Sequence, residues 1–161
     1  MAKARRKAKI DYDGGLCAGH LLIWTWRKLV QGQGDCPLLV REYDRFAGSN
    51  ADLLLAAFAA FLMALGRASR RTLSVGRPYC AGVTSDEEQM LCLVAAAQED
   101  DRALVAAHLV WMVRREQQES VTQAVNRLAA LLTVSGVALP TVRTGAPAGP
   151  ALLEIVRQAT V

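Results

Sequence analysis

The chain has 161 residues, of which 52% are apolar and 21% are charged, and its formal net charge is +4. This length and composition predict one domain that buries a sizeable core. The longest apolar run, Leu53 to Leu65, is shorter than the roughly 20 residues that cross a bilayer, so we expect no transmembrane segment. No apolar stretch typical of a signal peptide follows the basic start, so we expect a cytoplasmic protein with reduced cysteines.

The first segment of the chain is strongly basic. Such a block is usually a solvated, disordered arm, which we predict for residues 1–15. The alternative is contact with nucleic acid, an anionic lipid surface or an acidic partner. The basic residues of this arm are Lys3, Arg5, Arg6, Lys7 and Lys9.

Helical patterns begin after the arm. Apolar residues at helical spacing predict a first helix over 16–30. Asp35 as N-cap, with Pro37 in the first turn, predicts a second helix that ends near Gly48. A third helix, capped by the Ser49-Asn50-Ala51-Asp52 motif, is expected over about 51–69. It contains the long apolar run, so we expect protein to cover it on every side.

The second half begins with a segment of low helical character. We interpret residues 70–84 as an ordered loop, because a lone strand there would have nothing to pair with. Ser85 and Glu88 have the spacing of a capping box and predict a helix over the apolar residues that follow.

Two further helices are expected after that one. Asp100 or Asp101 would cap a helix that runs to Glu116, and Ser120 would open another that ends at Ser135-Gly136. A single helix over 101–134 is the alternative, and we favour the break.

Residues 137–161 form a Pro- and Gly-containing tail that closes with a short helix, ALLEIVRQA. Such a helix is marginal when isolated, so it must dock on this domain or on another molecule. We therefore predict an arm (1–15), a helical domain (16–136) and a tail. The expected fold is all-α, an irregular bundle of five to seven helices around a buried central helix at about 51–69.

Two tryptophans on the first helix give the best indication of a binding surface. Trp24 and Trp26 are two positions apart, so they cannot both lie fully in one core face of a helix. One of them would therefore lie at a surface where a partner binds, or be half covered by a neighbouring helix. The predicted partner-binding residues are Trp24, Trp26 and Arg27.

Four arginines gather at the end of the central helix and in the loop beyond. They could bind phosphate, but arginines also favour the last turn of a helix, and acidic residues nearby offer partners within the chain. We favour the structural interpretation. The arginines are Arg67, Arg70, Arg71 and Arg77.

Metal binding and catalysis have weaker support. Cys17 and His20 have a C-x-x-H spacing that could contribute to a zinc or haem site, but structural zinc sites usually show two such pairs. Free cysteines are more often core residues. No pattern of nucleophile and base indicates catalysis, so we expect no cofactor and no enzymatic activity.

A GRPYC loop and a T-x-x-E helix start, Thr84-Ser85-Asp86-Glu87, follow small Ala- and Leu-rich helices. In this arrangement the chain resembles small uncharacterised helical proteins of alphaproteobacteria. The resemblance implies a bacterial, cytoplasmic helical protein and assigns no activity.

From these patterns we expect a small regulatory or adaptor protein that acts through helix–helix contacts with an unidentified protein partner, as a homodimer. The alternative is a nucleic-acid-binding protein that uses the basic arm and the arginine cluster. A third hypothesis is metal or haem binding through Cys17 and His20.

Overall fold

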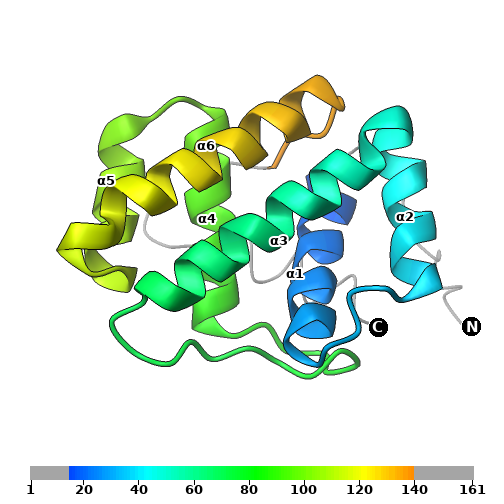
Figure 1. Ribbon diagram of the computed structural model, residues 1–161, viewed down its shortest axis with the longest axis horizontal. Coiled ribbons are helices and arrows are strands. Elements are labelled where there is room, and N and C mark those ends of the chain that lie inside the picture. Colours follow the sequence, from blue (N-terminus) through cyan, green and yellow to red (C-terminus); the bar gives the residue numbers. More distant parts are fainter. Residues whose placement is uncertain (1–14, 140–161) are drawn as a thin grey trace, which may run out of the picture.

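The computed structural model describes residues 15–139, with side chains from residue 18 onward, and this part of the chain is all-α (Figure 1). The α-helices are α1 (Gly15–Val30), α2 (Pro37–Ala47), α3 (Ala51–Ala68), α4 (Ser85–Gln98), α5 (Arg102–Met112) and α6 (Gln118–Val134). Short 3-10 turns, Gly48–Asn50 and Arg115–Gln117, precede α3 and α6. The predicted all-α class and helix number are confirmed. The predicted basic arm and the short C-terminal helix lie outside the described residues.

Helix α3 organises the bundle. It crosses the front of the molecule in Figure 1, beside α6, with α2 near its N-terminal end and α1 and α4 behind it. It packs directly on α1, α2 and α6, whereas α5 lies at the edge against α4 and α6. The predicted central helix over 51–69 therefore agrees with α3 to within one residue.

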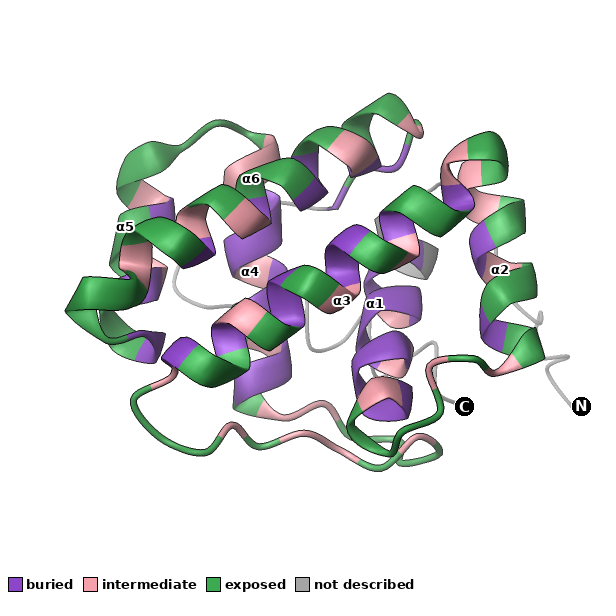
Figure 2. Ribbon diagram, in the orientation of Figure 1, coloured by how far each residue is buried: buried purple, intermediate pink, exposed green. Residues whose placement is uncertain are grey.

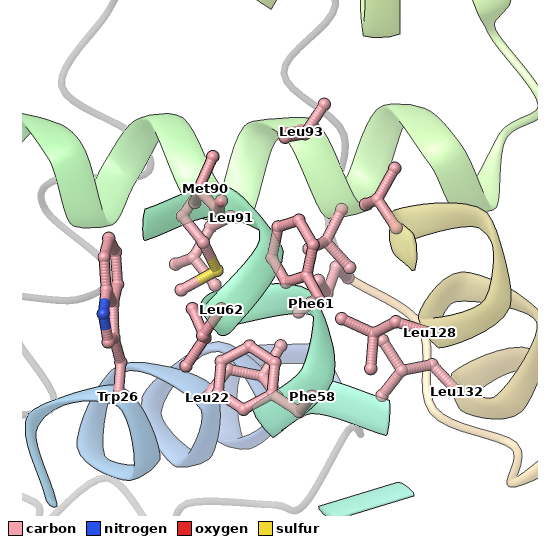
Figure 3. Close-up of a cluster of buried hydrophobic side chains, with 14 of the residues drawn as sticks. Leu22, Trp26, Phe58, Phe61, Leu62, Met90, Leu91, Leu93, Leu128 and Leu132 are labelled. Carbon is pink, nitrogen blue, oxygen red and sulfur yellow. The ribbon is translucent and has the colours of Figure 1, made fainter. Parts of the chain in front are cut away.

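The core forms where α3 meets its neighbours (Figure 3). Phe58 and Phe61 are fully buried, with their ring centroids 6.3 Å apart. Leu22 of α1, Met90 of α4 and Leu128 of α6 lie around them. Full burial of each such side chain contributes about 1.5–3 kcal/mol, so this cluster is a main source of stability.

Within residues 15–139, protein does not cover α3 on every side, although the apolar run predicts that it would. Neighbouring helices occupy one side only, and a line of exposed residues runs along the other, visible in green in Figure 2. We call this line the α3 outer face; it comprises Asp52, Leu53, Ala56, Ala60, Met63 and Arg67. At Ala56 and Ala60 the sequence pattern misled because alanine counts as apolar yet has little surface to bury. Leu53 and Met63 are large apolar side chains, and alanine chemistry does not explain their exposure.

Helices α2 and α3 together satisfy a membrane-span criterion. By length and composition, the stretch Pro37–Ala68 could cross a bilayer, although 39% of its most apolar window is buried in protein. A buried core helix passes the same test, so this is weak evidence. The chain also bends within the stretch, since Gly48 adopts a φ of +52°, a conformation that favours glycine. The absence of a transmembrane segment stays a prediction.

The helix starts differ in part from the predicted ones. The N-cap of α2 is Cys36 rather than Asp35, and Asn50 precedes α3 without a capping side-chain hydrogen bond. Asp101 caps α5 as predicted, with its side chain accepting a hydrogen bond from the backbone N–H of Leu104.

The capping box of α4 lies one residue earlier than predicted, at Thr84 and Glu87 instead of Ser85 and Glu88. The backbone N–H of Glu87 donates to Thr84 Oγ1 at 3.2 Å, and the Thr84 N–H donates to Glu87 Oε2 at 2.8 Å. The buried side chain of Arg27 donates to the Glu87 carboxylate, and this fixes the register.

We expect Thr84→Ala to destabilise the fold by about 1 kcal/mol, because it removes the cap of α4 and a hydrogen bond from Thr84 Oγ1 to the carbonyl of Ser74. The matched control, Ser85→Ala, changes an exposed hydroxyl and should shift stability by less than about 0.5 kcal/mol. Urea denaturation of both variants measures this. Equal losses in the two variants would contradict the observed register.

Helix α5 ends at Met112, before the predicted end at Glu116. Val113 adopts an extended conformation and bridges to Ser69. The N–H of Arg70 donates to the Met112 carbonyl at 3.0 Å, and the N–H of Arg114 donates to the Ala68 carbonyl at 2.9 Å. This short bridge joins the ends of α3 and α5, and the predicted break before α6 is present.

The helical domain extends past residue 136. Val137 and Leu139 are buried. The Gln98 side chain donates to the Val137 carbonyl and accepts from the Leu139 N–H, both at 2.8 Å. The boundary to the tail therefore lies at or beyond Leu139.

Candidate functional site

A buried ion pair fixes the loop between α3 and α4. The Arg27 side chain is 5% exposed and that of Glu87 is 0% exposed. Arg27 Nε donates to Glu87 Oε1 at 2.7 Å, and one terminal nitrogen donates to Oε2 at 2.8 Å. The remaining guanidinium hydrogens bind the carbonyls of Arg77, Cys80 and Gly82 at 2.6 to 3.1 Å. All five donors of Arg27 are thus used within the chain.

Glu87 also holds this loop, through hydrogen bonds from the loop backbone. Its carboxylate also accepts hydrogen bonds from the backbone N–H groups of Gly76 at 3.0 Å and Thr84 at 2.8 Å. A Cβ at position 76 would lie 2.7 Å from a guanidinium nitrogen of Arg27, so any other residue there would force this hydrogen-bonded side chain to shift. Burial alone would raise the pKa of Glu87, but the hydrogen bonds from Arg27 and the two backbone groups outweigh it and lower the pKa below 4.5.

A second ion pair holds the first part of the loop. Both terminal nitrogens of Arg71 donate to Asp86, at 2.8 and 2.6 Å, and the backbone N–H of Ser74 donates to the same carboxylate at 2.6 Å. The hydrogen bond from Arg71 lowers the pKa of Asp86. Two consecutive carboxylates at the start of α4 therefore anchor the loop, and both remain ionised at neutral pH.

The anchored loop forms one wall of an open groove of about 800 Å³. We call it the loop groove; it lies between the end of α1, the second half of α3 and residues 69–75. Its lining is mostly apolar. Its apolar side chains include Trp26, Leu29, Val30, Leu62, Met63, Leu73 and Val75.

The two tryptophans of α1 differ in burial, as their spacing predicts. Trp26 is buried in the core and also lines the loop groove, whereas Trp24 is half-buried. The Lys28 ammonium lies 5.7 Å from the Trp24 ring centroid and 5.4 Å from that of Tyr79. Arg27 is not available to a partner, because it is buried and hydrogen-bonded to the loop. Its assignment as a partner-binding residue is therefore corrected to a structural one.

The predicted arginine cluster is partly engaged in the fold. Arg71 binds Asp86, and Arg70 Nε donates to the Val113 carbonyl at 3.0 Å. Arg67 and Arg77 have exposed side chains. Two of the four arginines are thus bound within the fold, and the basic arm lies outside the described residues.

The predicted pair Cys17 and His20 can be placed only in part. Both belong to α1, and the Cys17 side chain lies outside the described residues. Burial, with a smaller contribution from the charge of Arg27, lowers the pKa of His20. Within the described part of the chain, no three His, Cys, Asp or Glu side chains gather as metal ligands.

The sequence patterns missed two features of the surface and the interior. Trp111 is 82% exposed on α5, opposite the buried face formed by Val105, Leu109 and Met112. Those three residues, spaced i, i+4 and i+7, indicate the core side of α5. The Arg27–Glu87 pair spans 60 positions and has no local pattern, so nothing in the sequence marks it.

A comparison with protein-family models gives no match. Comparisons with curated proteins and with solved structures give no significant match either.

Proposed function

We propose that this chain is a small, non-enzymatic cytoplasmic adaptor or regulatory protein that acts through helix–helix contacts and self-associates through the α3 outer face. The observation that carries the proposal is the exposure of large apolar side chains on the central helix. Leu53 is 61% exposed and Met63 is 55% exposed, with the exposed alanines Ala56 and Ala60 between them. A second subunit would cover such a face.

The spacing on this face suits an antiparallel pair of α3 helices. The exposed positions 53, 56, 60 and 63 alternate steps of three and four residues, as in helices that pack along their length. A two-fold axis near residue 58 would set Leu53 of one copy beside Met63 of the other, and Ala56 beside Ala60. The alanines at the centre allow close approach of the two helices, about 8 Å between axes.

Charges at the two ends of α3 favour the same orientation. Asp52 lies in the first turn and Arg67 in the last turn, and both are exposed. An antiparallel pair brings each Asp52 close to the Arg67 of the other copy. It also aligns the two helix dipoles antiparallel, which is favourable. A parallel pair would place like charges together.

The test is a matched pair of substitutions, each of which introduces one negative charge. Ala60→Glu puts a carboxylate in the centre of the proposed interface and should convert the dimer to a monomer. Ala107→Glu makes the same change at an exposed alanine of α5, near Trp111, and should leave the dimer intact. Sedimentation velocity of both variants reports the mass. If Ala107→Glu dissociated the dimer and Ala60→Glu did not, the interface would lie on α5, and this would contradict the proposal.

A further inference from the structure

The loop groove is an apolar surface that the described residues leave uncovered. Leu62 and Met63 of α3 form one side, Trp26 and Leu29 of α1 another, and residues 69–75 the third. Val30, at the end of α1, also lines the groove and is 63% exposed. Grooves of this volume and chemistry accept the apolar face of an amphipathic helix.

The chain itself contains a segment with that chemistry. In residues 151–159, ALLEIVRQA, one helical face would carry apolar residues at i, i+3, i+4 and i+7, and the opposite face would carry polar ones. The apolar positions are Leu152, Ile155, Val156 and Ala159. The polar positions are Glu154, Arg157 and Gln158. Nine residues form a marginal helix in water, so this segment needs a surface to cover its apolar face.

The connection is long enough to reach the groove. Leu139 lies against α1 at Gly19, since a Cβ there would be 4.0 Å from Leu139 Cδ2. Leu29, in the groove, is ten residues further along the same helix, about 15 Å away at 1.5 Å per residue. The thirteen residues from Leu139 to Leu152 can span up to about 43 Å. Three prolines in this connection, at 140, 147 and 150, oppose helix formation and favour an extended path.

We propose that residues 151–159 dock as an amphipathic helix in the loop groove of their own chain. Tethering favours this occupant over a separate molecule, because a short linker holds the segment at an effective concentration of roughly millimolar. A partner helix that uses the same groove must first displace the segment. Met63 borders both the loop groove and the proposed dimer interface, but the two proposals are tested at separate positions, Ile155 for the docking and Ala60 for the dimer.

Hydrogen–deuterium exchange of the full chain tests the docking. The native amides of residues 151–159 should exchange at least about tenfold more slowly than those of an unstructured peptide. Ile155→Glu places a charge on the apolar face and should remove this protection. It should also speed exchange in residues 69–75, which form the exposed wall of the groove. The change lies outside the core cluster, so the helical domain remains folded.

The matched control is Gln158→Glu, which adds the same charge to the polar face of the segment and should leave both regions protected. Protection must also be independent of protein concentration, because the contact lies within one chain. Three results would overturn the proposal: exchange of native 151–159 at the unstructured rate, unchanged exchange of residues 69–75 in Ile155→Glu, or loss of protection on dilution. The last result would assign the groove to the tail of a second copy.

Discussion

Replacing Glu87 with alanine should destabilise the protein by about 3–5 kcal/mol, a large share of the 5–15 kcal/mol typical of a whole domain. The substitution leaves the Arg27 guanidinium buried without its counter-ion, and it releases the backbone N–H groups of Gly76 and Thr84. The Glu87 half of the α4 capping box is lost at the same time, whereas the Thr84 hydroxyl can still accept from the backbone N–H of residue 87. Urea denaturation of Glu87→Ala against the native chain gives the value.

The control is the double variant Arg27→Ala/Glu87→Ala. Because it removes both charges, its cost should be less than the sum of the two single costs. Strict additivity would mean that the two side chains stabilise the fold independently, which would contradict the buried pair.

The same carboxylate predicts a dependence on pH. The pKa of Glu87 in the fold is below its usual 4.5, so its contribution to stability is complete above about pH 4.5 and is lost as the pH falls through the lower folded value. Asp86, whose pKa is also lowered, acts in the same direction. As the pH falls below about 4.5, the native chain should therefore lose stability more steeply than Glu87→Ala does. Parallel curves would contradict this assignment.

Phe61→Ala should cost about 3–5 kcal/mol, because the fully buried ring leaves a cavity between α3, α4 and α6. Leu53→Ala, eight positions earlier on the same helix, removes a side chain that is 61% exposed and lies outside the loop groove. Its cost should stay within about 0.5 kcal/mol when measured at concentrations where the chain is monomeric. Thermal denaturation of both variants measures these losses of stability. Similar losses at the two positions would contradict the orientation of α3.

Much of the helical architecture could be predicted from local patterns. Asp101 as a cap and Pro37 in a first turn mark helix starts through chemistry that acts over one turn, and both lie where expected. The register of α4 could not be predicted locally. Ser85 and Thr84 are both acceptable caps, and the choice depends on Glu87, which is fixed by Arg27, 60 positions away.

The candidate surfaces were harder to predict, because exposure is set by packing. The apolar run of α3 indicates a central helix, but it does not show that Ala56 and Ala60 face away from the other helices. The different exposures of Trp24 and Trp26 follow from their spacing, since residues two apart diverge on a helix. Arg27 resembles a surface cation in the sequence and is buried only because a distant carboxylate and three loop carbonyls converge on it.

We propose that the α3 outer face joins two copies of the chain, and sedimentation equilibrium of the native protein from about 1 µM to about 1 mM tests this self-association. The mass should rise with concentration and level off at twice the 17.4 kDa of one chain. A mass that remains at 17.4 kDa over the whole range would contradict self-association.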